Sequence, residues 1–455
     1  MDIRSGSISL IVLAAVWLVG TGGPRSACAQ STASDPPAGA APETEAPAGA
    51  ETDRDDPRRH VSSGAIRWSD GSAGKKEEGE SEEEAEAQNE PTLDLSVGGA
   101  LRFNVLFEGF DRDNRLKEGE FTFDTFRLNA DGTYGDLFFA AEYRFYTGYR
   151  FLKEGYVGYN VTDDLSATFG VHQVPFGIQP YHSNSWFFNL QYYAGFEDDV
   201  DAGVKVAYEP GPWSLKAAYY MNAEQTGFAG GTGLARYSFD VVPVDSAALG
   251  YAGIDGDRQN QEVDQFNLKV TYTLDHGSLG QTTIGASGQS GGLYNRSMQE
   301  TDRGASGMAH LEGRYGRFTV RLSAARYSWN PVLPDGQSDD FVAMGAYDAP
   351  YKVASEGAFY GAGLSYRQPV SAGPISALTF YEDVSHFDKG PEGWTDATSF
   401  ITGILTEAGP IYAYTDFLVT RNHPFSIPGA DFGSALAEGS DDWHVSFNMN
   451  LGIYF

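Results

Sequence analysis

The sequence predicts an all-β fold: a transmembrane antiparallel β-barrel of about 16 strands with long outer loops and short periplasmic turns. Three observations predict it. Long segments alternate apolar and polar residues with a period of two. The connections between these segments alternate between short and long. After the amino-terminal region, no apolar run approaches the length of a membrane-spanning helix.

The alternation is clearest at the carboxyl end of the chain, from Trp443 to Phe455. Every second residue there is apolar, and the residues between them are mostly small or polar. The run is longer than a typical strand of a soluble protein. It suits a tilted strand that crosses a bilayer, with lipid on one side and a polar lumen on the other.

Segments of this kind recur along the chain from Leu93. Phe121 and Phe123 are out of phase with the apolar residues that follow, which predicts a β-bulge near Asp124-Thr125. The predicted strands are 93–107, 119–132, 136–147, 151–160, 164–174, 200–209, 212–222, 264–275, 280–289, 305–315, 317–329, 356–368, 374–386, 397–406, 410–420 and 442–455.

The connections indicate the topology. Every second one is tight, as around Gly135, Pro210-Gly211 and Gly316. The others are mostly long and comprise 109–118, 175–199, 223–263, 290–304, 330–355, 387–396 and 421–441, with a short exception at 148–150. Short turns on one rim and long loops on the other are typical of outer-membrane barrels. A closed barrel also leaves no exposed sheet edge.

The amino-terminal region differs from the rest in composition. Residues 1–29 are typical of a signal peptide, with an apolar stretch and a small-x-small site at Ala27-Cys28-Ala29. A lipoprotein anchor on Cys28, the only cysteine, is the alternative. Residues 30–92 are rich in Pro, Ala and Glu and predict a disordered, acidic periplasmic tether. Residues 93–455 are then the barrel domain.

One long connection is unusual in composition. Val174 to Asp201 is aromatic, contains no Lys or Arg and ends in several carboxylates. We interpret it as a loop that lines or folds into the mouth of the barrel and narrows the pore, because a loop in a wet lumen can satisfy its backbone amides. The alternative is an ordinary packed surface loop. Its candidate constriction residues are Tyr181, Trp186, Glu197, Asp198 and Asp199.

If the apolar residues face lipid, the opposite parity assigns charged side chains to the lumen. The candidate pore-lining residues are Arg102, Arg127, Arg144, Glu142, Glu154, Lys205, Lys216, Lys269, Arg314 and Arg321. They either pair with one another as structural charges or form a cationic track that guides anions. By parity, Arg127 and Arg144 are also expected to meet Glu197, Asp198 or Asp199.

No enzymatic motif is apparent: the chain has no GxSxG, no HExxH and no Cys/His cluster. We therefore expect no enzymatic activity, no cofactor and no nucleic-acid partner. The whole chain carries a net charge of -31, and its outer-loop carboxylates could bind divalent cations, although no fixed ligand spacing appears.

The residues from Asp124 to Gly177 resemble the phosphate-selective porin O and P family. The resemblance is carried by an Arg-containing strand at Arg127, by YVGY at 156–159 and by the run from Gly170 to PFG at 175–177. The terminal Phe455 is similar to the assembly signal of outer-membrane barrels. The resemblance implies a 16-stranded barrel, a trimer and passive conduction of small solutes. The stretch 174–201 has no Lys or Arg for binding phosphate.

These features predict a porin in the bacterial outer membrane, a water-filled channel for passive diffusion of small solutes, with anions such as phosphate as candidate solutes. Its expected partners are outer-membrane lipid, small hydrophilic solutes or ions, and two further copies of itself in a homotrimer. The alternative is a non-conducting barrel that acts as a structural anchor or adhesin. A lumen of this width holds water unless something fills it.

Overall fold

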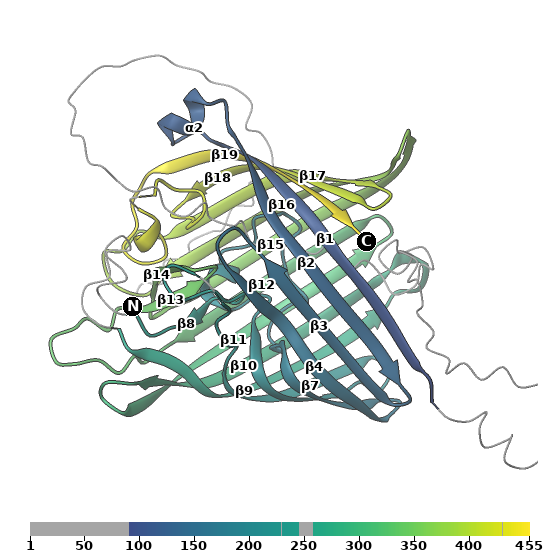
Figure 1. Ribbon diagram of the computed structural model, residues 1–455, viewed down its shortest axis with the longest axis horizontal. Coiled ribbons are helices and arrows are strands. Elements are labelled where there is room, and N and C mark those ends of the chain that lie inside the picture. Colours follow the sequence, from purple (N-terminus) through teal and green to yellow (C-terminus); the bar gives the residue numbers. More distant parts are fainter. Residues whose placement is uncertain (1–90, 229, 245–257, 430) are drawn as a thin grey trace, which may run out of the picture. The chain divides into compact units, whose positions relative to one another are not determined.

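The computed structural model describes residues 91–228, 230–244, 258–429 and 431–455. The signal peptide predicted for 1–29 and the tether predicted for 30–92 lie outside this part of the chain, apart from residues 91 and 92. The described chain forms a closed antiparallel barrel of 16 strands (Figure 1), as the sequence predicts.

All 16 predicted segments are barrel strands, with ends shifted by a few residues. The strands are β1 (Leu93–Glu108), β2 (Glu120–Tyr134), β3 (Leu137–Phe145), β4 (Arg150–Thr162), β5 (Leu165–Gln173), β6 (Val200–Tyr208), β7 (Trp213–Ala223), β9 (Asn260–Asp275), β10 (Gln281–Asn295), β11 (Glu300–Tyr315), β12 (Phe318–Ser328), β15 (Glu356–Ala372), β16 (Ile375–Lys389), β17 (Ala397–Ala408), β18 (Ile411–Arg421) and β19 (Trp443–Tyr454).

The first and last strands close the barrel. β1 pairs with β2 on one side and with β19 on the other, where Ala100 is opposite Tyr454. The tight turns lie on the rim where β1 begins and β19 ends, and they depend on glycine. In two of these turns, Gly211 and Gly316 have φ of 61° and 62°. Side chains other than glycine rarely adopt this conformation, which explains the glycines at these turns.

The predicted bulge is present. Leu101 is opposite Phe126, whereas Phe103 is opposite Phe123, so β2 contains one extra residue at Asp124-Thr125. Asp124 and Thr125 are therefore both buried on the inner side, while Phe123 on the outer side is 39% exposed. The bulge aims a carboxylate into the lumen that strict alternation would have pointed elsewhere.

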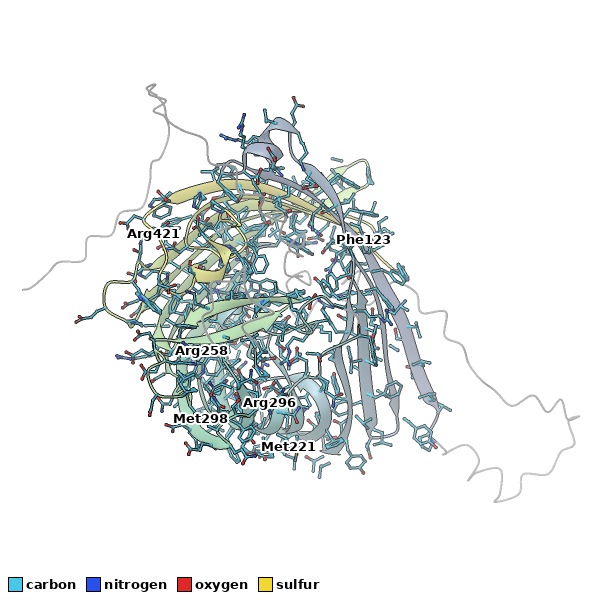
Figure 2. The ribbon with its side chains drawn as sticks, turned by 60° about the vertical axis from the view of Figure 1, so that its left-hand side comes forward. Phe123, Met221, Arg258, Arg296, Met298 and Arg421 are labelled. Carbon is cyan, nitrogen blue, oxygen red and sulfur yellow. The ribbon has the colours of Figure 1, made fainter. Side chains whose placement is uncertain are left out.

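The outer wall is apolar. In β19, Trp443 and Val445 are exposed, whereas Ser446 and Asn448 are buried inside, as the alternation predicts. Figure 2 labels two further exposed apolar side chains, Phe123 and Met221, on other strands. This wall is the surface that a barrel of the bacterial outer membrane presents to lipid. Among the described residues, no helix is both long and apolar enough to cross a membrane.

Some segments predicted as loops have regular structure. Strands β8 (Asp240–Val241), β13 (Phe341–Ala346) and β14 (Ala349–Ala354) form a small sheet, hereafter the inner sheet. Much of 290–304, predicted as a loop, continues β10 and β11 as a hairpin. The short helices are α2 (Arg112–Leu116), η1 (Tyr192–Ala194), η3 (Gly277–Leu279) and η4 (Phe432–Ser434).

The inner sheet is buried on both faces, since every residue of β13 and β14 is buried. It packs with aromatic residues of the loops between barrel strands, including Tyr192, Tyr237 and Phe239, into one large apolar cluster. The long loops, on the rim opposite the tight turns, thus fold over and into the barrel and form a hydrophobic core there.

The outer wall can be tested by placing a charge on it. Phe169 in β5 is 72% exposed on the outer side. Phe169→Arg should cost about 2–4 kcal/mol, because its guanidinium would face hydrocarbon. Ser166→Arg on the inner side of the same strand should cost much less. The measurement is the fraction of heat-modifiable, folded barrel, and equal losses for the two variants would contradict the assignment of faces.

Candidate pore constriction

The connection between β5 and β6 enters the barrel. Its base is closed by the backbone of Val174, whose N–H donates to the carbonyl of Asp199 over 2.8 Å. Nearly every residue between them is buried, and the indole of Trp186 is fully covered. The sequence-based interpretation of an inward loop therefore agrees with its placement, and we call residues 174–199 the inward loop.

Carboxylates on the opposite wall hold the tip of this loop. The backbone N–H groups of Asn184 and Ser185 each donate to Asp383 Oδ2 over 2.7 Å. The N–H of Trp186 donates to Asp416 Oδ2 over 2.9 Å. Asp383 and Asp416 lie in the middle of β16 and β18, so the loop tip reaches the opposite wall about halfway along the strands.

Glu197, a residue of the inward loop itself, also accepts hydrogen bonds from backbone N–H groups of the loop. It accepts the N–H of His182 over 2.8 Å and the N–H of Ser183 over 3.1 Å. Burial raises the pKa of Glu197 to about 7, although these hydrogen bonds act in the opposite direction. The carboxylate therefore acts mainly as an acceptor for backbone amides that have left the sheet.

The aromatic residues of the inward loop pack against the inner sheet. Phe188 and Tyr192 stack with ring centroids 3.9 Å apart. The hydroxyls of Tyr192 and Tyr347 are 2.8 Å apart and hydrogen-bonded. Tyr181, a predicted constriction residue, is buried against Phe188. These contacts fix the loop between the barrel wall and the inner sheet.

Two of the predicted lumen arginines form ion pairs with Glu142. Arg127 and Arg144 are directly opposite each other on β2 and β3. Glu142 lies 3.6 Å from Arg127 and accepts a hydrogen bond from Arg144 Nε over 2.5 Å. A carboxylate between two facing guanidiniums offsets their repulsion. The guanidinium of Arg144 also lies 4.5 Å from the ring centroid of Tyr237.

Among the expected loop-acid partners, Asp198 interacts electrostatically with Arg144. Asp198 accepts hydrogen bonds from Gln173 over 2.9 Å and from the Tyr237 hydroxyl, and Lys153 lies 3.8 Å away. Glu142, which was also predicted to line the lumen, is two residues from Arg144 on the same face of β3. The local register thus gives both arginines a carboxylate on their own or the neighbouring strand.

Arg102 links the wall to the inward loop. It lies 3.3 Å from Asp124 at the bulge, and both side chains are fully buried. Its guanidinium lies 4.8 Å from the ring centroid of Trp186. A cation over an indole face is stabilised when both are desolvated. Bulge, arginine and loop tip form one packed unit.

The predicted lysines lie on the arc of wall formed by β6, β7 and β9. Lys216 and Lys269 are directly opposite each other in register, and Lys205 is on the next strand. Lys269 Nζ donates to Gln179 of the inward loop over 2.9 Å, and Lys205 Nζ donates to the carbonyl of Gln173 over 3.0 Å. We call these three residues the lysine cluster.

Four predicted site residues remain to be placed: Arg314, Arg321, Glu154 and Asp199. Arg314 and Arg321 both pair with Glu312, each over 2.8 Å. Arg321 also donates to Asn184 of the inward loop over 3.0 Å. Glu154 is half-buried on β4. Asp199 is buried at the foot of the loop.

Several residues of this site were missed from the sequence. Asp383 was missed, whereas parity alone places Asp416 on the inner face of its strand. The role of both carboxylates depends on a loop about 200 residues away. Tyr237 and Tyr347 lie in segments predicted to be outer loops. The continuous apolar run at 341–346 was a usable signal, since such runs are typical of strands buried on both faces.

The fold is that of known outer-membrane channels. An anion-selective porin from Comamonas acidovorans matches with a TM-score of 0.50 and 14% identity, covering 80% of this chain and 100% of that one. The outer-membrane channel DcaP of Acinetobacter baumannii matches with a TM-score of 0.50 and 12% identity, covering 80% and 97%. No family model and no curated protein matches the sequence. The resemblance to the phosphate-selective porin O and P family stays a prediction.

The anchoring of the inward loop predicts a local effect of Asp383→Ala. Two buried backbone N–H groups would lose their acceptor, at a cost of about 1–3 kcal/mol. Amide hydrogen exchange at residues 184–187 should accelerate by about tenfold or more, as this cost implies. Glu382→Ala changes the neighbouring carboxylate on the opposite face of β16 and should leave the loop protected. Equal protection in both variants would contradict the anchoring.

Proposed function

We propose that this protein is a passive diffusion channel of the bacterial outer membrane, and that small anions pass preferentially along the wall beside the inward loop, next to the lysine cluster. The observation that carries the proposal is the division of charge inside the barrel. Carboxylates at the tip of the loop are occupied by backbone amides, and Glu142 is occupied by arginines, whereas lysines line the wall beside the loop.

The charges of the arginines near the loop are largely compensated. Arg102 and Arg144 are fully buried beside Asp124 and Glu142. In contrast, the Lys216 side chain keeps 29% of its surface exposed, and Lys205 is half-buried. Partly solvated cations on neighbouring strands raise the local concentration of anions in a narrow passage.

The preference should be moderate. Glu209 lies 3.5 Å from Lys216, and Glu312 sits between Arg314 and Arg321. These carboxylates reduce the positive potential without cancelling the lysine cluster. Inorganic phosphate fits a site of this kind because lysines bind it as point charges, and the resemblance to phosphate-selective porins supports the same class of solute.

The non-conducting anchor or adhesin remains the second candidate, and a specific observation favours it. The loops bury a large aromatic cluster on the outer-loop side of the barrel, and Tyr193, Tyr237 and Tyr351 within it are fully covered. Planar-bilayer recording separates the two candidates, since an anchor would give no discrete conductance steps.

We also propose a homotrimer. On the outer wall, Arg326 lines a hollow of about 480 Å³ together with small residues such as Gly307 and Ala358 and with the carboxylates of Glu356 and Asp388. A charged side chain facing hydrocarbon is costly. Small residues allow another backbone to approach closely. A second copy of the chain covering this part of the wall would remove Arg326 from lipid.

The lysine cluster predicts the effect of a single charge on selectivity. Lys216→Gln should lower the anion-to-cation permeability ratio by up to about fivefold, which corresponds to about 1 kcal/mol for a nearby charge in water-like surroundings. The measurement is the reversal potential of single channels in a salt gradient.

Arg303→Gln is the matched control, because it removes the same charge from an exposed residue on the outer face of β11. Its reversal potential should stay at the wild-type value. Equal shifts in both variants, or a shift in neither, would rule out the lysine cluster as the selective element.

A further inference from the structure

Four buried carboxylates and the half-buried Glu262 lie together where the foot of the inward loop meets the inner sheet. Carboxylate oxygens of Asp199, Asp201 and Asp240 all lie within 4.8 Å of one another. Asp199 ends the inward loop, Asp201 is on barrel strand β6 and Asp240 is on inner-sheet strand β8. Glu224 and Glu262 interact electrostatically with the same group.

In two of these carboxylates, one oxygen accepts hydrogen bonds from the protein and the other oxygen has no hydrogen-bond partner. Asp201 accepts from Gln265 through Oδ2 over 3.0 Å, and its buried Oδ1 has no hydrogen-bond partner. Glu224 accepts from the backbone of Tyr237 and Ser238 through Oε1, and its buried Oε2 has none. The buried Oδ1 of Asp199 likewise has none.

The charge of this group is poorly balanced. Arg236 donates to Asp240 over 2.8 Å and lies 4.0 Å from Glu224. It is the one cation with a recorded ion pair to the cluster among the described residues. Burying several carboxylates around a single guanidinium is unfavourable unless further positive charge joins them.

We propose that Asp199, Asp201 and Asp240 bind a divalent cation of the calcium class, with Glu224 and Glu262 in the surrounding shell. Ca²⁺ prefers several oxygen ligands, among them carboxylates from different segments, at irregular geometry. The three converging residues are all aspartates, and softer transition metals would favour imidazole or thiolate. The unpartnered oxygens are the atoms that such an ion would engage.

The ion would join three parts of the molecule that backbone pairing connects only weakly. β8 pairs with β13 through two residues. The Ser238 hydroxyl accepts from the backbone N–H of Val200 and donates to its carbonyl. A bound cation would fasten the foot of the inward loop to the wall and to the inner sheet. The proposal concerns binding and local order, and it does not depend on the solute that the barrel conducts.

The test is calorimetric titration of CaCl₂ into the full-length protein in detergent after removal of metals with a chelator. The wild type should bind about one Ca²⁺ per chain, with a Kd between about 10⁻⁶ and 10⁻³ M. Asp240→Asn should weaken this binding by about tenfold or more. Asp335→Asn, an exposed loop acid outside the cluster, should bind as the wild type does.

A second readout uses the wild type alone, in case Asp240→Asn does not fold. Calcium should slow amide hydrogen exchange at residues 196–201 and 236–244, and the chelator should reverse the effect. Absence of saturable binding, wild-type affinity in Asp240→Asn, or exchange that ignores calcium would each overturn the proposal.

Discussion

The arrangement inside this barrel depends on one requirement: backbone amides that leave the sheet within a membrane-spanning barrel must find acceptors. The tip of the inward loop, from His182 to Trp186, meets it with carboxylates. Glu197 serves the first part of the tip, and Asp383 and Asp416 serve the rest from the opposite wall. Without them, the aromatic side chains alone would not compensate the loss of hydrogen bonds.

This use of carboxylates shapes the electrostatics of the lumen. Acids that accept backbone N–H groups, or that pair with buried arginines, contribute less negative potential to the passage. The lysine cluster lies beside the loop, where Gln173 and Gln179 contact Lys205 and Lys269. The satisfaction of the loop amides thus occupies the carboxylates at the loop tip, while the lysine cluster lies on the wall beside the loop. This difference is the basis of the proposed anion preference.

Much of the fold follows from the sequence, because strand alternation is a local property. The phase change around Asp124 was enough to predict the bulge, and the aromatic character of 174–201 indicated an inward loop. Partner choice is not local. Asn184 and Asp383 are 199 residues apart, so their contact could not be read from either segment. The pairing of Arg144 with Glu142 was one of the open alternatives, because parity alone does not choose among the charges of the inner face.

The most direct test of the account is the single-channel conductance of a chain in which Ile178 to Gly195 is replaced by a short linker. The barrel strands remain intact in this variant, and heat modifiability checks that they fold. If the inward loop forms the constriction, conductance in planar bilayers should rise clearly above the wild-type value. Unchanged conductance would contradict the claim and identify the loop as packing that does not limit the passage.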